Sequence, residues 1–88
     1  MEDKMIKTIE VTDIERNYKN PVAELVEKAC NYSSHIALQS EGKNINAKSL
    51  MGVMAFGLKK GMKVLISTEG DDHEMAMEGI SDFLSCSA

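Results

Sequence analysis

The stretch that decides the fold is KSLMGVM at residues 48–54, taken together with Gly57 and the run MKVLIST at residues 62–68. Ser49 is a favoured helix N-cap residue, because its hydroxyl accepts a hydrogen bond from a backbone N–H group of the first turn. The apolar residues after it predict a short helix, to about Met54, that is ended by Gly57. Residues 62–68 predict a strand. We therefore expect a capped short helix, a turn and a strand in direct succession.

Towards the N-terminus, the pattern predicts one strand and one longer helix. Residues 5–11 (MIKTIEV) alternate apolar and polar side chains, which is typical of a half-buried strand. After a polar stretch at residues 12–20, Asn20-Pro21 indicates a helix start, since Asn is a favoured N-cap and the missing N–H of proline costs nothing at the first helical position. The helix should run to about Tyr32, with an apolar face formed by Val22, Leu25, Val26 and Ala29.

A hairpin and a last helix complete the chain. Residues 35–40 (HIALQS) and 43–46 predict two strands joined by a tight turn at Glu41-Gly42. The pattern Asp71-x-x-Glu74 resembles a capping box and predicts the start of a helix. The inward face of that helix would consist of Ala76, Ile80, Phe83 and Leu84. The order β-α-β-β-α-β-α predicts the α+β class, with one antiparallel sheet that carries its helices on one face.

Composition narrows the classes of function. The chain has 88 residues, 43% of them hydrophobic and 27% charged, which suits a single globular domain over residues 1–88. Such a domain has little volume for an enclosed active site, so we expect a protein that is not an enzyme. A net charge of −4 argues against nucleic acid as the main ligand. Without a membrane-length apolar run or a signal peptide, we expect a cytoplasmic protein without direct membrane contact.

The cysteines and histidines indicate neither a disulfide framework nor a metal site. Cys30 and Cys86 lie far apart and show no CxxC or Cys/His spacing, so we interpret them as reduced thiols. His35 and His73 stand alone, without the further ligands that a metal ion needs. We expect no metal and no cofactor.

The stretch KSLMGVM, with Gly57, Lys60-Gly61 and the strand after it, resembles the regulatory serine segment of the HPr family. This family comprises the small phosphocarrier proteins of the bacterial sugar phosphotransferase system. The order of the elements, the hairpin Glu41-Gly42-Lys43 and the helix starts at Asn20-Pro21 and Gly70-Asp71 also fall where the family has them. The resemblance covers nearly the whole chain and implies an open-faced β-sandwich, with four antiparallel strands under three helices.

The chain departs from the family pattern at the phosphocarrier segment. The family has Gly-(Ile/Leu)-His-Ala-Arg-Pro before the first helix, whereas residues 16–21 are RNYKNP here. Tyr18 thus takes the position of the phosphoacceptor histidine, and Asn20 takes that of the arginine. A phenol with a pKa of about 10 stays protonated at neutral pH, and its phosphate ester would be a poor donor. The guanidinium group that best holds phosphate oxygens is missing as well.

We therefore expect no phosphoryl relay through this segment. Tyr18 is then either a loop residue without a role or part of a contact surface, since tyrosine offers a large amphipathic area at low entropic cost. Phosphorylation of Tyr18 itself is the least favoured interpretation.

Ser49 has two interpretations. Taken alone, it is a helix cap. The resemblance implies more, because in one branch of the HPr family an HPr kinase/phosphorylase phosphorylates the matching serine, and the product is a corepressor for a catabolite-control transcription factor. A phosphate at a helix N-terminus would keep the helix and change the charge beside an apolar patch. The catabolite-repression variants of the family lack the histidine, have glutamine there and keep the serine. This chain resembles them, with tyrosine in place of the glutamine.

We expect the partner interface to include residues from both segments, namely Tyr18, Lys19, Asn20, Lys48, Leu50, Met51 and Met54. Methionine suits adaptable contact surfaces. The competing interpretation places Leu50, Met51 and Met54 in the core. We expect that for at least one of them, because so short a helix needs an anchor.

Three functions stay open at this point. The first is a regulator switched at Ser49 and recognised by HPr kinase/phosphorylase and by a catabolite-control transcription factor or other phosphotransferase-system proteins. The second is a phosphocarrier that uses another residue. The third is a diverged module that binds a small anion or a partner at the helix start of residues 18–21. The protein would be a monomer or a dimer that exchanges its first strand.

Overall fold

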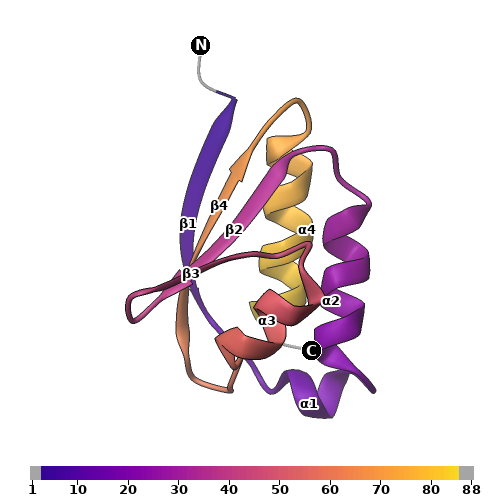
Figure 1. Cartoon of the computed structure of the whole chain (residues 1–88), viewed down its shortest axis with the longest axis vertical. Coiled ribbons are helices and arrows are strands. Elements are labelled where there is room, and N and C mark those ends of the chain that lie inside the picture. Colours follow the sequence, from indigo (N-terminus) through magenta and orange to yellow (C-terminus); the bar gives the residue numbers. More distant parts are fainter. Residues whose placement is uncertain (1–2, 86–88) are drawn as a thin grey trace.

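The sheet consists of the four antiparallel strands that the sequence predicts. The computed structural model describes residues 3–85, and its strands are β1 (Lys4–Glu10), β2 (His35–Ser40), β3 (Lys43–Asn46) and β4 (Lys63–Glu69). They lie in the order β1-β4-β2-β3, so the first strand pairs with the last and forms one edge of the sheet (Figure 1). The bounds of β1 and β4 each differ by one residue from those expected.

Helices cover one face of this sheet and leave the other open (Figure 1). The three expected helices are α2 (Pro21–Cys30), α3 (Leu50–Phe56) and α4 (His73–Ser85). α2 packs against both α3 and α4, and α4 also covers β1 and β4. The open-faced arrangement of the α+β class is thereby confirmed.

A further helix, α1 (Ile14–Asn17), lies within residues 12–20, where the sequence indicates only a polar stretch. It is a single turn, followed by Tyr18, whose backbone N–H donates to the Ile14 carbonyl oxygen at 2.9 Å. Ile14 is buried and anchors the turn to the core. One apolar residue creates no helical periodicity, which is why the pattern does not predict this turn.

The core lies between the sheet and the helices. On β4, the alternating residues Val64, Ile66 and Thr68 are fully buried, while β1 and β2 pair with this strand on its two sides. The expected inward faces of the two longer helices are confirmed, with these residues buried or packed against the core: Val22, Leu25, Val26, Ala29, Ala76, Ile80, Phe83 and Leu84. Across residues 3–85, none of the helices has the length and apolar character to cross a membrane.

The last helix begins one residue later than predicted, at His73, so Asp71 does not take the N-cap position and the expected capping box is wrong. The carboxylate of Asp72, which directly precedes α4, contacts the loop before β2. It accepts hydrogen bonds from the backbone N–H groups of Ser33 and Ser34, each at 2.9 Å, and from the Ser34 hydroxyl. The Ser34 hydroxyl, followed by the Ser33 N–H, lowers the pKa of Asp72 from 3.8 to about 2. These bonds fix the start of α4 to the loop before β2.

Candidate functional site

The start of α2 is capped by the side chains of Asn20 and Glu24. Asn20 is the N-cap and Pro21 the first helical residue, as predicted, and the Asn20 side chain accepts a hydrogen bond from the Ala23 N–H at 3.4 Å. The Glu24 carboxylate accepts one from the Asn20 N–H at 2.9 Å. A negative charge therefore lies where a phosphate would have to approach the helix, and the two would repel each other.

Tyr18 is held inside the fold. Its ring stacks on that of Phe83 in α4, with ring centroids 4.0 Å apart and planes inclined by 10°. Its hydroxyl donates to the Phe83 carbonyl oxygen at 3.3 Å. The side chain is half-buried and packs against the core. Tyr18 thus ties the segment before α2 to the C-terminal part of α4, a structural role that the sequence alone does not reveal.

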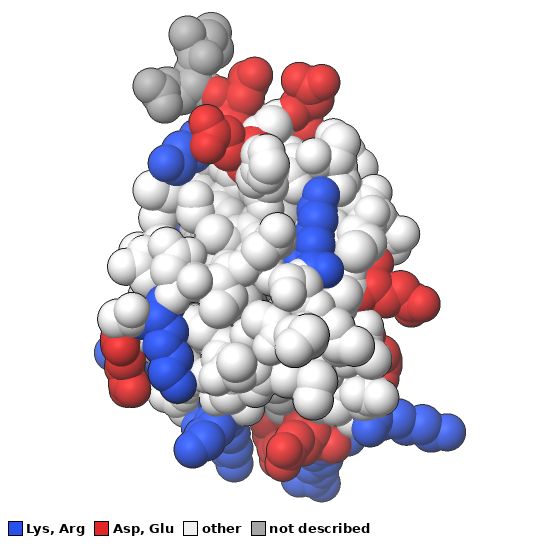
Figure 2. Space-filling view, viewed as in Figure 1, with Lys and Arg blue, Asp and Glu red and all other residues white. Residues whose placement is uncertain are grey.

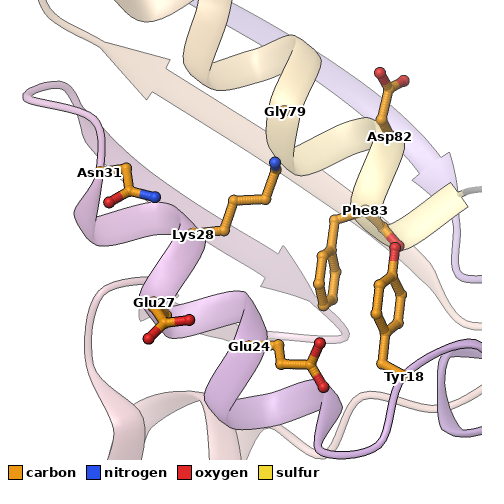
Figure 3. Close-up of a pocket in the computed structure, with 8 residues that line it drawn as sticks. All are labelled: Tyr18, Glu24, Glu27, Lys28, Asn31, Gly79, Asp82 and Phe83. Atoms are coloured by element: carbon orange, nitrogen blue, oxygen red, sulfur yellow. The ribbon is translucent and has the colours of Figure 1, made fainter.

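Tyr18 also lines a groove of about 490 Å³ between α2 and α4. Figure 3 shows the Tyr18 and Phe83 rings side by side, and the Lys28 side chain reaching from α2 towards Gly79 on α4. The remaining residues of the lining are Glu24, Glu27, Asn31 and Asp82. Three carboxylates against one ammonium group make this groove unfavourable for a phosphate.

Ser49 caps α3, as the sequence predicts. Its Oγ accepts a hydrogen bond from the Gly52 N–H at 3.1 Å, and the side chain is half-buried. At the other end of α3, Gly57 adopts the left-handed conformation with a φ of 75°, and its N–H donates to the Val53 carbonyl oxygen. The hydroxyl therefore lies at the start of a helix that is capped at both ends.

An apolar patch, which consists of Leu50, Met51 and Met54, lies on the outer side of α3. These side chains are 48%, 81% and 64% exposed, so the expectation that at least one of them is core is wrong. Val53 and Phe56, which are fully buried, anchor the helix instead. Figure 2 shows a broad area without charged side chains over α3. An apolar surface of this kind on a small protein is typical of a contact site.

The residues expected to form one interface come from two segments, the connection before α2 and the start of α3, and that interface stays a prediction. Lys48 directly precedes the α3 patch, but its ammonium group donates to the Tyr32 carbonyl oxygen at 2.7 Å and is thereby fixed. Tyr18 lines the groove between α2 and α4, which contains no residue of α3. Lys19 and Asn20 are exposed in the connection that follows α1.

Among the described residues, His35, His73 and Cys30 form no cluster. His35 is exposed on β2, and Nδ1 of His73 lies 2.9 Å from the Gly70 carbonyl oxygen. Cys30 is exposed and unpaired, whereas Cys86 lies outside the described residues, so its expected reduced state stays a prediction. In the part of the chain from residue 3 to 85, no three His, Cys, Asp or Glu side chains converge as a metal site would require.

The sequence also matches a known family over nearly its whole length. The family model described as "PTS HPr component phosphorylation site" matches residues 6–85. The chain belongs to the HPr family. Its open-faced sheet is thus the fold of this family.

Relatives of known description include carriers and regulators of this HPr family. The chain is 38% identical over 64 residues to the HPr-like protein Crh of Halalkalibacterium halodurans, which covers 73% of this chain and 76% of that protein. The phosphocarrier protein HPr of Bacillus anthracis has a similar structure, with a TM-score of 0.83 and 31% identity over 93% of this chain and 98% of that one. Crh of Bacillus subtilis, described as a dimer with a swapping domain, has a TM-score of 0.68 and 29% identity, with 85% and 82% covered.

Proposed function

We propose that this chain is a non-enzymatic regulator of the HPr family, which does not relay phosphate and is switched by phosphorylation of Ser49. The observation that carries the proposal is the state of Tyr18. Where the family has its phosphoacceptor histidine, this chain has a phenol that is stacked on Phe83 and hydrogen-bonded to a backbone carbonyl. A nucleophile for phosphoryl transfer needs activation by a base or a lowered pKa. Glu24 adds a negative charge at the helix start, which opposes an incoming phosphate.

Ser49 is suited to a switch because its modification would leave the scaffold intact. The hydroxyl is only half-buried and lies at the start of α3, where backbone N–H groups and the helix dipole favour a negative group. The buried anchors Val53 and Phe56 lie further along the helix and hold it independently of the cap. A phosphate would add about −1.5 to −2 charges directly beside the exposed Leu50 and Met51.

The α3 patch is the surface that a partner would recognise. Its exposed Leu50, Met51 and Met54 offer adaptable apolar contact, and Ser49 lies at its edge. A partner that presents apolar side chains and a basic group would discriminate the phosphorylated form from the unmodified one. We infer two partner classes from the HPr family, an HPr kinase/phosphorylase that modifies Ser49 and a catabolite-control transcription factor that recognises the product.

The test is incubation with ATP and an HPr kinase/phosphorylase, followed by intact mass and mapping of the site. We expect one added phosphate, on Ser49. The variant Ser49→Ala should remain unmodified, while Ser67→Ala, which changes a serine on β4, should be modified like the parent. An unmodified parent chain would refute the switch.

The third function left open by the sequence, a small-anion site at residues 18–21, is disfavoured by one specific contact. The Glu24 carboxylate already accepts the Asn20 N–H, and Glu27 and Asp82 line the adjacent groove. Transfer through another residue is likewise disfavoured, since His35 and His73 belong to other parts of the fold, β2 and the start of α4.

We also propose that β1 is the segment through which two copies would exchange a strand. β1 is an edge strand and pairs with β4 only. Val11, which follows β1, forms two hydrogen bonds with the loop before β4. Its N–H donates to the Met62 carbonyl oxygen, and its carbonyl oxygen accepts from the Gly61 N–H. If β1 is exchanged between two copies, the chain would therefore have to change its direction after Val11. Light scattering at low and high protein concentration tests this, since a single monomeric mass at both would exclude the exchanged dimer.

A further inference from the structure

A second cavity, of about 450 Å³, lies between the β2–β3 hairpin and the loop that joins α3 to β4. We refer to it as the lysine pocket. It is lined by Glu41, Lys43, Phe56, Gly57, Lys59, Lys60, Gly61 and Met62. Its volume lies within the range of small-molecule sites. It is at the C-terminal end of α3, opposite the end that Ser49 caps, and the proposed switch does not use it.

Charge distinguishes this pocket from the groove beside Tyr18. The lining of the lysine pocket has three lysines and one carboxylate, whereas the lining of the groove has three carboxylates and one lysine. Figure 2 shows Lys and Arg side chains around the lower left of this face, where Figure 1 places the hairpin tip and the α3–β4 loop. The molecule thus gathers positive charge in this hollow although its net charge is negative.

The three lysines of the pocket are available for a ligand. Among residues 3–85, no hydrogen bond or ion pair engages the ammonium groups of Lys43, Lys59 and Lys60, in contrast to that of Lys48, which binds a carbonyl oxygen. Lys59 and Lys60 also line a smaller hollow together with Asp13 and Glu15, but form no ion pair with them within the described chain.

The backbone around the pocket is held in place. Gly57 and Gly61 turn the loop in the left-handed conformation, with φ values of 75° and 85°. The loop is then fixed to the end of β1, because the Gly61 N–H donates to the Val11 carbonyl oxygen at 2.7 Å and the Val11 N–H to that of Met62 at 2.8 Å. A site whose frame is already ordered loses less entropy when it binds a ligand.

We propose that the lysine pocket binds a small molecule that carries phosphate groups. Ammonium groups on flexible stems bind phosphate oxygens as point charges, and three of them match a ligand with two or more negative charges. The half-buried Met62 provides an apolar wall for the body of such a ligand. The chain would thereby sense a phosphorylated metabolite at one end of α3 and, under the function proposed above, be modified at the other.

Titration with inorganic pyrophosphate at constant ionic strength, followed by amide chemical shifts in NMR, tests the proposal. We expect saturable shifts at Lys43, Gly57, Lys59 and Gly61, with a Kd of about 1 mM or tighter, and none with glucose. Non-saturating shifts, or the same shifts with glucose, would overturn the proposal.

Matched double variants separate the site from general charge attraction. Lys59→Ala with Lys60→Ala should weaken binding at least tenfold. Lys7→Ala with Lys19→Ala removes the same two charges from exposed positions outside the pocket and should change the Kd less than twofold. Equal weakening in both pairs would contradict the assignment. Binding to the Ser49→Ala variant should equal that of the parent, so this result is independent of the proposed switch.

Discussion

Tyr18 has a structural role at the position where we expect the HPr family to have its phosphoacceptor histidine. A histidine there would present a ring nitrogen that can accept and return a phosphoryl group. The tyrosine instead contributes a stacked ring and a hydrogen bond to α4. The loss of the phosphoryl relay stays a prediction from the sequence, whereas the stacking could not be predicted, because Tyr18 and Phe83 lie 65 positions apart and no local pattern links them.

Restoring the histidine alone should not restore the carrier. In Tyr18→His, Asn20 still provides no guanidinium group, and the Glu24 carboxylate still occupies the helix start. We expect no phosphate on this variant after incubation with phosphoenolpyruvate and the upstream phosphotransferase of the system, measured by intact mass at alkaline pH. The triple variant Tyr18→His, Asn20→Arg, Glu24→Ala should accept an acid-labile phosphate. Equal labelling of the single and triple variants would show that Glu24 and Asn20 do not matter.

Asp72 makes stability depend on acid pH. Its pKa is lowered to about 2 in the folded chain, against 3.8 ordinarily, by the Ser34 hydroxyl and the Ser33 N–H. A lowered pKa stabilises the fold above the unfolded value, and this contribution is lost as pH falls from about 4 to 2. Asp72→Asn should therefore be less stable at neutral pH and lose less stability over this interval. Urea unfolding at several pH values measures it, and parallel pH profiles for the two proteins would contradict this role.

At the scale of elements, the strongly periodic helices could be predicted and the short ones only in part. α2 and α4 each repeat an apolar face several times, whereas α1 has one buried residue, Ile14. α3 combines buried and exposed apolar side chains that the sequence pattern does not distinguish. Its apolar residues are equally hydrophobic in the sequence, but only the structure separates the buried Val53 and Phe56 from the exposed Met51 and Met54.

This division predicts two opposite outcomes for α3. Phe56→Ala removes a fully buried ring and should lower the free energy of unfolding by about 3–5 kcal/mol. Met51→Ala changes a side chain that is 81% exposed and should alter it by less than about 0.5 kcal/mol. Chemical denaturation measures both. A strongly destabilised Met51→Ala would mean that the α3 patch is part of the core and not a contact surface.

The connection from β4 to α4 depends on a glycine. Gly70 has a φ of 148°, and a Cβ there would lie 2.8 Å from the Ser34 Cα and 2.6 Å from its Oγ. Gly70→Ala should therefore cost about 3 kcal/mol, from strain and contact together. Gly42→Ala is the matched control, since its φ is 82° but the space around it is open, and it should cost about 1 kcal/mol. If urea unfolding shows the same loss of stability for both variants, the contact with Ser34 makes no contribution.

At the scale of the whole molecule, the fold forms surfaces from segments that lie far apart in the sequence. Tyr18 lines the acidic groove between α2 and α4, and the apolar patch lies on α3, while the expected interface between residues 18–20 and those around Ser49 stays a prediction. The lysine pocket is assembled from β3 and the α3–β4 loop, which no sequence motif connects. Patterns along the chain predict elements, and the sheet order β1-β4-β2-β3 decides which of them meet.

The central claim is that this HPr-type scaffold has lost the relay. The most direct measurement is the rate of sugar phosphorylation in a reconstituted phosphotransferase system in which this chain is the only carrier, with phosphoenolpyruvate as donor. We predict a rate equal to that of the mixture without any carrier. Sugar phosphate formed at a carrier-dependent rate, together with a phosphohistidine at His35 or His73, would contradict the account.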